Sequence, residues 1–74
     1  MKVLLFGVLA EAVGKSEIKM SASDIHSLKE NLFREFPHLK NYSFQIAVNK
    51  ERVEKNVVLN NDDEVALLPP FAGG

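Results

Sequence analysis

Residues 23–37 read SDIHSLKENLFREFP, and this stretch predicts the main helix of the chain. Its apolar residues recur at spacings of three and four, the period that places side chains on one face of an α-helix. This face consists of Ile25, Leu28, Leu32, Phe33 and Phe36. Charged residues fill the opposite face, namely Lys29, Glu30, Arg34 and Glu35. Ser23 or Asp24 supplies the capping oxygen, and Pro37 ends the helix because the residue before a proline avoids helical geometry.

Four segments outside this helix predict β-strands. Residues 2–8 and 65–68 are the most uniformly apolar, which is typical of strands covered on both faces at the centre of a sheet. Residues 15–20 and 44–48 alternate between apolar and polar side chains, as half-buried strands do. All four segments are short enough for a compact domain.

Shorter segments complete the order of elements. Residues 9–13 predict a helical turn that Gly14 ends in left-handed geometry. A turn at residues 49–51 leads into a short return strand around Val53. Residues 60–63, which read NNDD, predict a turn because asparagine and aspartate tolerate left-handed geometry.

The order strand, strand, helix and then two or three strands predicts an α+β fold. One helix covers one face of a mixed sheet of four to five strands, because no second helix of the same quality is predicted. The first and last strands are expected side by side and parallel at the sheet centre, since the chain between them is long enough to allow this pairing. This arrangement is a ubiquitin-like β-grasp. It is expected over residues 1–68, with an extended tail over residues 69–74.

Composition excludes several classes of function. The 74 residues allow one domain, and a hydrophobic content of 46% argues against disorder. A net charge of −1 without a basic stripe argues against nucleic-acid binding. No apolar run reaches membrane-spanning length, so a cytoplasmic protein is expected. Cysteine is absent, and His26 and His38 lack partners at ligand spacing, so no metal site is expected and both histidines should be exposed.

The last eight residues, LLPPFAGG, are the most informative segment for function. Pro69 and Pro70 donate no backbone hydrogen bond and favour an extended chain, so the sheet ends there. Gly73 and Gly74 lack a β-carbon and therefore allow close approach to another protein or a nucleotide. No charged side chain follows Glu64, so the tail carries only its terminal carboxylate. A Gly-Gly end alone is also compatible with a frayed terminus, but its conjunction with the prolines and the fold favours a function.

The stretch DEVALLPPFAGG, residues 63–74, resembles the closing signature of the MoaD-type sulfur carriers, the small subunits of molybdopterin synthase within the ThiS/MoaD-like proteins. The segments VLLFG at residues 3–7 and AVN at residues 47–49 are similar as well. The resemblance covers essentially the whole chain. Two departures are Asp62, where the family often has glycine, and Ala10-Glu11, where an arginine is common nearby.

The resemblance implies that the carboxylate of Gly74 is adenylated from ATP by an adenylyltransferase similar to the ubiquitin-activating enzymes. A sulfur donor protein then supplies the sulfur that turns it into a thiocarboxylate. The loaded tail inserts into the large molybdopterin synthase subunit and gives its sulfur to the pterin precursor. The tail residues are Pro69, Pro70, Phe71, Ala72 and Gly73. The carrier itself binds no cofactor in this scheme and acts as a non-catalytic subunit without an autonomous active site.

Strand alternation predicts a surface for these partners. If Val3, Leu5, Val65 and Leu67 face the helix, the opposite face carries Leu4, Phe6, Ala66 and Leu68. No helix is predicted to cover this apolar face, so we expect it to bind a partner, unless loops half-bury it. Phe71 is expected either to anchor the tail in a partner pocket or to fold back onto its own sheet.

Two other functions stay open at this point. A related carrier could deliver sulfur to thiazole or to transfer RNA, with the same fold and the same Gly-Gly end. The residues PPFA before the glycines favour the pterin pathway through the resemblance. A non-carrier β-grasp module would bind proteins through its sheet and have an idle tail.

Overall fold

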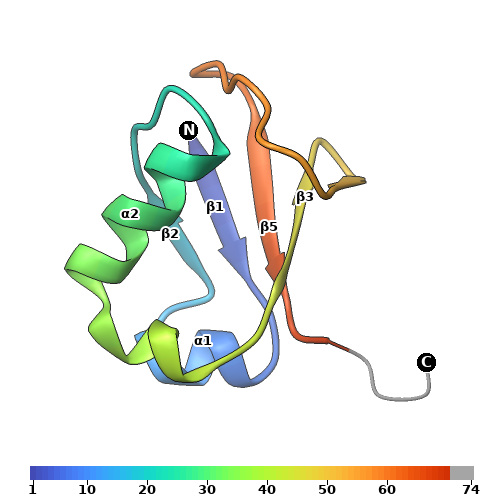
Figure 1. The fold of residues 1–74 in the computed structure, drawn as a ribbon. Coiled ribbons are helices and arrows are strands. Elements are labelled where there is room, and N and C mark those ends of the chain that lie inside the picture. Colours follow the sequence, from blue (N-terminus) through green and yellow to red (C-terminus); the bar gives the residue numbers. More distant parts are fainter. Residues whose placement is uncertain (71–74) are drawn as a thin grey trace.

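The computed structural model describes residues 1–70. Along the chain the elements are β1 (Lys2–Leu5), α1 (Val8–Val13), β2 (Glu17–Lys19), α2 (Ile25–Glu35), the 3₁₀-helix η1 (Pro37–Asn41), β3 (Gln45–Val48), β4 (Glu51–Val53) and β5 (Glu64–Leu68). Five strands form one mixed sheet in the order β2-β1-β5-β3-β4, and α2 packs on one of its faces (Figure 1). The predicted α+β architecture is confirmed.

The parallel pair β1–β5 forms the centre of the sheet. Val3 lies opposite Val65 and Leu5 lies opposite Leu67 in this pair. The outer strands are antiparallel to their neighbours, β2 to β1, β3 to β5 and β4 to β3. The prediction that the two most apolar strands pair in parallel is therefore confirmed.

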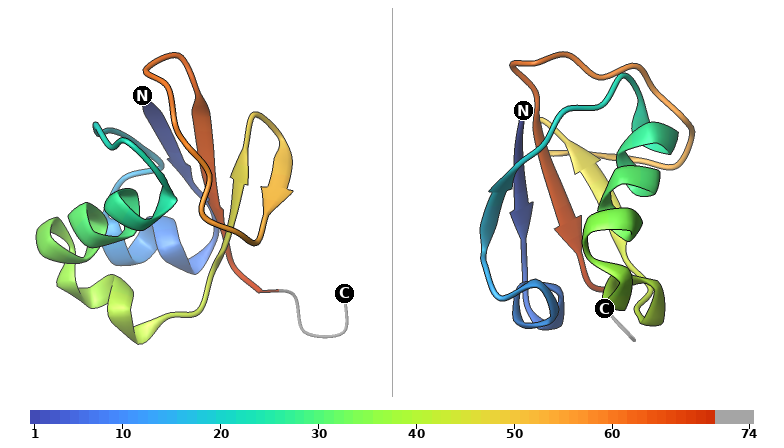
Figure 2. Two further views of the ribbon diagram at one scale, coloured as in Figure 1. Left: turned by 45° about the horizontal axis from the view of Figure 1, so that its top comes forward. Right: turned by 90° about the vertical axis from the view of Figure 1, so that its left-hand side faces the viewer.

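The core lies between α2 and the helix-facing side of the two central strands. Val3, Val65 and Leu67 are fully buried and Leu5 is 2% exposed, and they form one cluster with the fully buried Leu28 and Leu32 of α2. Figure 2 shows α2 along one side of the sheet, with α1 at the end where β1 and β5 finish. Burial of each large aliphatic side chain stabilises the fold by roughly 1.5–3 kcal/mol.

Both ends of α2 follow the sequence signals. Asp24 is the N-cap, and its carboxylate accepts the backbone N–H of Ser27 at 2.8 Å. The helix ends at Glu35, immediately before Phe36 and Pro37. The 3₁₀-helix η1 that follows was not predicted. It buries a single leucine, Leu39, and so gives no periodic signal.

The predicted first strand, residues 2–8, is too long. Strand β1 ends at Leu5 because Gly7 adopts a φ of 57° and Val8 begins α1. Gly14 ends α1 with a φ of 87°, as predicted. The second strand is likewise shorter than the predicted 15–20 and spans only Glu17–Lys19.

The two predicted turns use different devices. The β3–β4 hairpin turns on Asn49 and Lys50, with φ angles of 50° and 72°, and Glu51 already belongs to β4. The turn at residues 60–63 does not use the left-handed geometry that its composition suggested. Within residues 1–70, the non-glycine residues with positive φ are those of the hairpin alone. Asp63 closes the second turn instead, since its carboxylate accepts the Asn60 N–H at 2.7 Å and the Asn49 amide at 2.9 Å.

These hydrogen bonds predict a pH dependence of stability. The backbone N–H of Asn60 and then the side-chain amide of Asn49 hold the pKa of Asp63 below its ordinary value of 3.8. Because the folded state lowers this pKa, the stabilisation is present above pH 3.8 and is lost as the pH falls below it. Urea unfolding should be measured for each protein at pH 7 and at pH 2. Between these pH values Asp63→Asn should lose less free energy of unfolding than the wild type, and the control Asp62→Asn should lose as much as the wild type. Equal acid loss in wild type and Asp63→Asn would contradict the assignment.

Candidate functional site: the tail root and the uncovered sheet face

The tail begins at the centre of the sheet. Strand β5 lies between β1 and β3, and its last residue, Leu68, pairs with Gln45 of β3. Pro69 is half-buried and Pro70 is exposed. The remaining predicted tail residues lie outside the described part of the chain, namely Phe71, Ala72, Gly73 and Gly74. The predictions made for these four residues stay predictions.

The turn after β1 contacts the start of the tail. The backbone N–H of Phe6 donates to the carbonyl oxygen of Leu67 at 3.3 Å, which extends the β1–β5 pairing beyond the strand. A β-carbon on Gly7 would lie 3.3 Å from Cγ of Pro69. Glycine is therefore favoured at position 7 by its positive φ and by the closeness of this proline. We call Gly7 and Pro69, with the Phe6–Leu67 hydrogen bond, the tail root.

The sheet face opposite α2 carries the side chains predicted by alternation. Leu4 and Ala66 are paired neighbours on β1 and β5, and Ala47 of β3 lies beside Ala66. Leu4, Ala66 and Leu68 are half-buried rather than fully exposed. Phe6 follows β1 at the tail end of this face and is 45% exposed. The structure thus gathers the predicted residues into one apolar surface that leads to the tail root.

Sequence reasoning missed one exposed apolar side chain beside this surface. Val8 is 40% exposed and directly follows Gly7 at the start of α1. The sequence analysis placed Val8 at the end of the first strand, whereas it is the first residue of α1. Strand alternation therefore could not predict the exposure of its side chain. The exposed apolar surface at the tail root therefore includes both neighbours of Gly7.

Side chains that could carry out chemistry are sparse in the described residues. No group of three or more His, Cys, Asp or Glu within residues 1–70 could hold a metal ion. The side chain of His26 is 74% exposed and lies 3.9 Å from Glu30, and His38 is also exposed. No charged or polar side chain in this part of the chain is buried. The described residues therefore present an apolar surface and the start of the tail.

No helix among the described residues has the length and apolar character needed to cross a membrane.

Comparison with known structures places the fold among the ubiquitin-like β-grasp proteins. The solution structure of small archaeal modifier protein 1 from Methanosarcina acetivorans superposes with a TM-score of 0.86 at 27% identity, covering 99% of this chain and 94% of that one. A chain of the complex of subunits 1 and 2 of the molybdopterin-converting factor from Helicobacter pylori gives 0.75 at 29% identity, covering 99% and 96%.

Sequence comparison identifies the family within the ubiquitin-like β-grasp proteins. The chain belongs to the ThiS family, whose profile matches residues 3–74. It is 31% identical to the molybdopterin synthase sulfur carrier subunit of Dictyostelium discoideum, over 99% of this chain and 94% of that protein. It is 33% identical to the protein of the same name from Mycobacterium tuberculosis, over 97% and 94%. The predicted resemblance to the MoaD-type carriers is confirmed.

The tail root predicts different effects for two glycine substitutions. Gly7→Ala and Gly14→Ala both place a side chain at positive φ, which costs roughly 1–3 kcal/mol of stability. Only Gly7→Ala also adds a contact to Pro69, because nothing lies within 4 Å of a β-carbon on Gly14. We expect both variants to unfold at lower urea concentration. Amide chemical shifts of the β5 end at Leu67 and Leu68 should move only in Gly7→Ala, and equal movement in both would contradict a contact specific to the tail.

Proposed function

We propose that this protein is a sulfur carrier in the biosynthesis of the molybdenum cofactor. The observation that carries the proposal is the continuity of β5 with the segment PPFAGG, in a chain that is similar over nearly its whole length to molybdopterin synthase sulfur carrier subunits. In this proposal the carboxylate of Gly74 is the reacting group. The protein is the non-catalytic subunit of a sulfur-transferring complex and acts in the cytoplasm.

The chemistry requires a terminal carboxylate and partner enzymes. A carboxylate is a poor acyl donor, so the activating enzyme first joins the Gly74 carboxylate to the α-phosphate of ATP and releases pyrophosphate. A persulfide of the donor protein then attacks the acyl carbon and displaces AMP, which gives an acyl disulfide between carrier and donor. A thiol cleaves this sulfur–sulfur bond, so that the thiocarboxylate is released and the thiol ends in a disulfide with the donor. The thiocarboxylate is a soft nucleophile that delivers sulfur to the pterin precursor. ATP is consumed at the partner, and no side chain of the described domain takes part.

The domain would serve this chemistry by presenting the tail. The apolar face formed by Leu4, Phe6, Ala66 and Leu68 would dock on the large synthase subunit while the tail enters that subunit's active site. Burial of such a surface can drive association. The complex of two subunits known from Helicobacter pylori supports a partner of this kind. The activating enzyme and the sulfur donor would meet the same tail in earlier steps.

Sulfur loading tests the role of Gly74. The full chain, incubated with ATP, the activating enzyme and a sulfur source, should gain the mass difference between sulfur and oxygen. Deletion of Gly74, or addition of one residue after it, should abolish this gain, because the terminal carboxylate is then displaced by one residue along the tail. The exposed substitution Lys15→Ala is the control and should load normally. Normal loading of the deletion variant in intact-mass measurements would reject the proposal, as would failure of the wild type.

A sulfur-transfer assay with the loaded wild-type chain distinguishes among the possible sulfur acceptors. Transfer of its sulfur to the pterin precursor in the presence of the large synthase subunit is the expected result. Transfer only to a thiazole precursor or to transfer RNA would assign it to a related carrier pathway. A chain that never loads, but still binds proteins through its sheet, would be the non-carrier module.

Leu68→Asp tests the docking face. A carboxylate at this position would have to be desolvated in an apolar interface, so affinity for the large subunit should fall by about tenfold or more. Val58→Asp is the control, since Val58 is 77% exposed and lies outside the docking face. Affinity can be measured by calorimetry, and urea unfolding shows whether each variant is folded. An unchanged affinity in folded Leu68→Asp would exclude the proposed face.

A further inference from the structure

Strand β2 is one of the two edge strands of the sheet, and Figure 2 shows it as the outermost strand beside β1. Met20, directly after β2, donates its N–H to the Met1 carbonyl oxygen at 3.1 Å and accepts from the Met1 amino group at 2.9 Å. Main-chain groups of successive residues in a strand point to alternate edges. The main chain of Ile18 therefore also faces β1, whereas the N–H and carbonyl groups of Glu17 and Lys19 point away from the sheet.

This outer edge of β2 is accessible. Glu17 and Lys19 are exposed, and within residues 1–70 their main chains form no hydrogen bond with the main chain of another element. On the side of α2, a hollow of about 480 Å³ borders the end of the strand, and its lining includes Met20, Asn31 and Arg34. An extended chain therefore has room to pair with this edge.

The two outward-facing residues of β2 carry opposite charges on the same face of the sheet. Glu17 lies opposite Leu4 of β1, and Lys19 lies opposite Lys2. Like charges on directly opposite residues destabilise a pair of strands. The salt bridge found within residues 1–70 joins other side chains, so neither lysine is paired with a carboxylate in the part of the chain that the structure describes. An acidic group beside Lys19, on the open side of β2, would offset this repulsion.

We propose that two copies of this chain associate by pairing their β2 strands in antiparallel orientation about a two-fold axis at Ile18. In this register Glu17 of each copy lies opposite Lys19 of the other, which forms two cross-strand pairs of opposite charge. Main-chain hydrogen bonds form at the same positions, because the outward-facing groups of the two strands meet there. Each Lys2–Lys19 pair gains a carboxylate as its next neighbour, and the two half-buried Ile18 side chains meet at the axis.

The charge pattern favours this register over those next to it. An axis one residue earlier would place the two Glu17 carboxylates opposite each other. An axis one residue later would do the same to the two Lys19 ammonium groups. Like charges at opposite positions disfavour both of these pairings, whereas the axis at Ile18 makes both charge pairs attractive.

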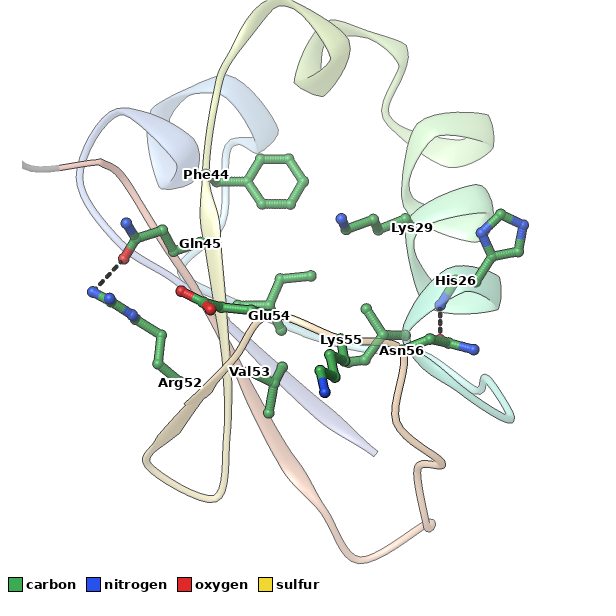
Figure 3. Close-up of a pocket in the computed structure, with 11 residues that line it drawn as sticks. His26, Lys29, Phe44, Gln45, Arg52, Val53, Glu54, Lys55 and Asn56 are labelled. Carbon is green, nitrogen blue, oxygen red and sulfur yellow. Dashed lines mark hydrogen bonds between the residues drawn. The ribbon is translucent and has the colours of Figure 1, made fainter.

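The other edge strand, β4, does not offer this complementarity. The Asn49 N–H donates to the Glu64 carbonyl oxygen at 2.7 Å, so alternation turns the main chain of Ala47 toward β5 as well. Arg52 lies opposite Ala47 and is therefore the residue of β4 whose main chain points outward. A symmetric pairing centred there would place two Arg52 side chains opposite each other. The Arg52 guanidinium also donates already to the Gln45 side chain, at 3.0 Å (Figure 3).

The proposed dimer is compatible with use of both tails. The two-fold axis is perpendicular to the sheet, so the two sheets become one continuous sheet with both docking faces on the same side. Strand β5 is parallel to β1 and therefore runs antiparallel to β5 of the other copy, so the two tails leave at opposite ends. This inference does not rest on the proposed sulfur chemistry, and either can fail without the other.

Self-association of the full chain tests the proposal. An interface of one short strand pair is small and weak, so sedimentation equilibrium and NMR spectra are recorded from about 10 µM to about 1 mM protein. We expect a reversible monomer–dimer equilibrium in which hydrogen exchange of the Glu17 and Lys19 amides slows as the concentration rises. The amide of Ile18, which faces β1, is the internal reference and should not change. A monomer over the whole range, or slowed exchange at Arg52 instead, would overturn the proposal.

Charge-reversal variants make the test specific to the register. Glu17→Lys and Lys19→Glu each create like charges at both paired positions, so each variant alone should dimerise about tenfold more weakly than the wild type. An equimolar mixture of the two variants restores both pairs of opposite charge and should form a heterodimer. Glu51→Lys makes the same charge change as Glu17→Lys on the other edge strand and should dimerise like the wild type.

Two results would reject the register, provided that circular dichroism shows every variant to be folded. The first is a mixture of Glu17→Lys and Lys19→Glu that associates no better than either variant alone. The second is equal weakening of the dimer by Glu17→Lys and Glu51→Lys, since this would show a general effect of net charge.

Discussion

The parallel pairing of β1 with β5 is the constraint on which the rest of the structure depends. It joins the beginning of the chain to the end of the described domain and contributes Val3, Leu5, Val65 and Leu67 to the core. Parallel strands finish at the same edge of a sheet, so the turn after β1 lies beside the start of the tail. For this reason a β-carbon on Gly7 would lie only 3.3 Å from Cγ of Pro69. The tail therefore follows a central strand whose helix-facing side chains, Val65 and Leu67, are fully buried.

Strong, repeated patterns made much of this fold predictable. The spacing of apolar residues in α2 and the uniformly apolar central strands each depend on several residues, so one ambiguous position does not change the result. The errors fall where one tertiary contact decides a local conformation. Val8 is apolar enough for a strand, but the positive φ of Gly7 changes the chain direction, and Val8 becomes the first residue of α1. Asp63 shapes its turn through Asn49, a residue of another hairpin, and composition alone does not reveal that bond.

The candidate site was predictable to a different degree in each part. Alternation correctly placed Leu4 and Ala66 on the face opposite the helix, because side chains on a strand change face at every residue. The closeness of Pro69 to position 7 was not predictable, since it depends on the register of two strands far apart in the sequence.

In the proposed function the reacting atom belongs to the main chain, and this places unusual demands on the domain. Its side chains need not activate anything, so they are free to provide recognition on every surface. An apolar face gives affinity through buried area but discriminates poorly among apolar partners. In the described domain the apolar face lies beside the tail root, so a partner that covered this face would also lie next to the start of the tail.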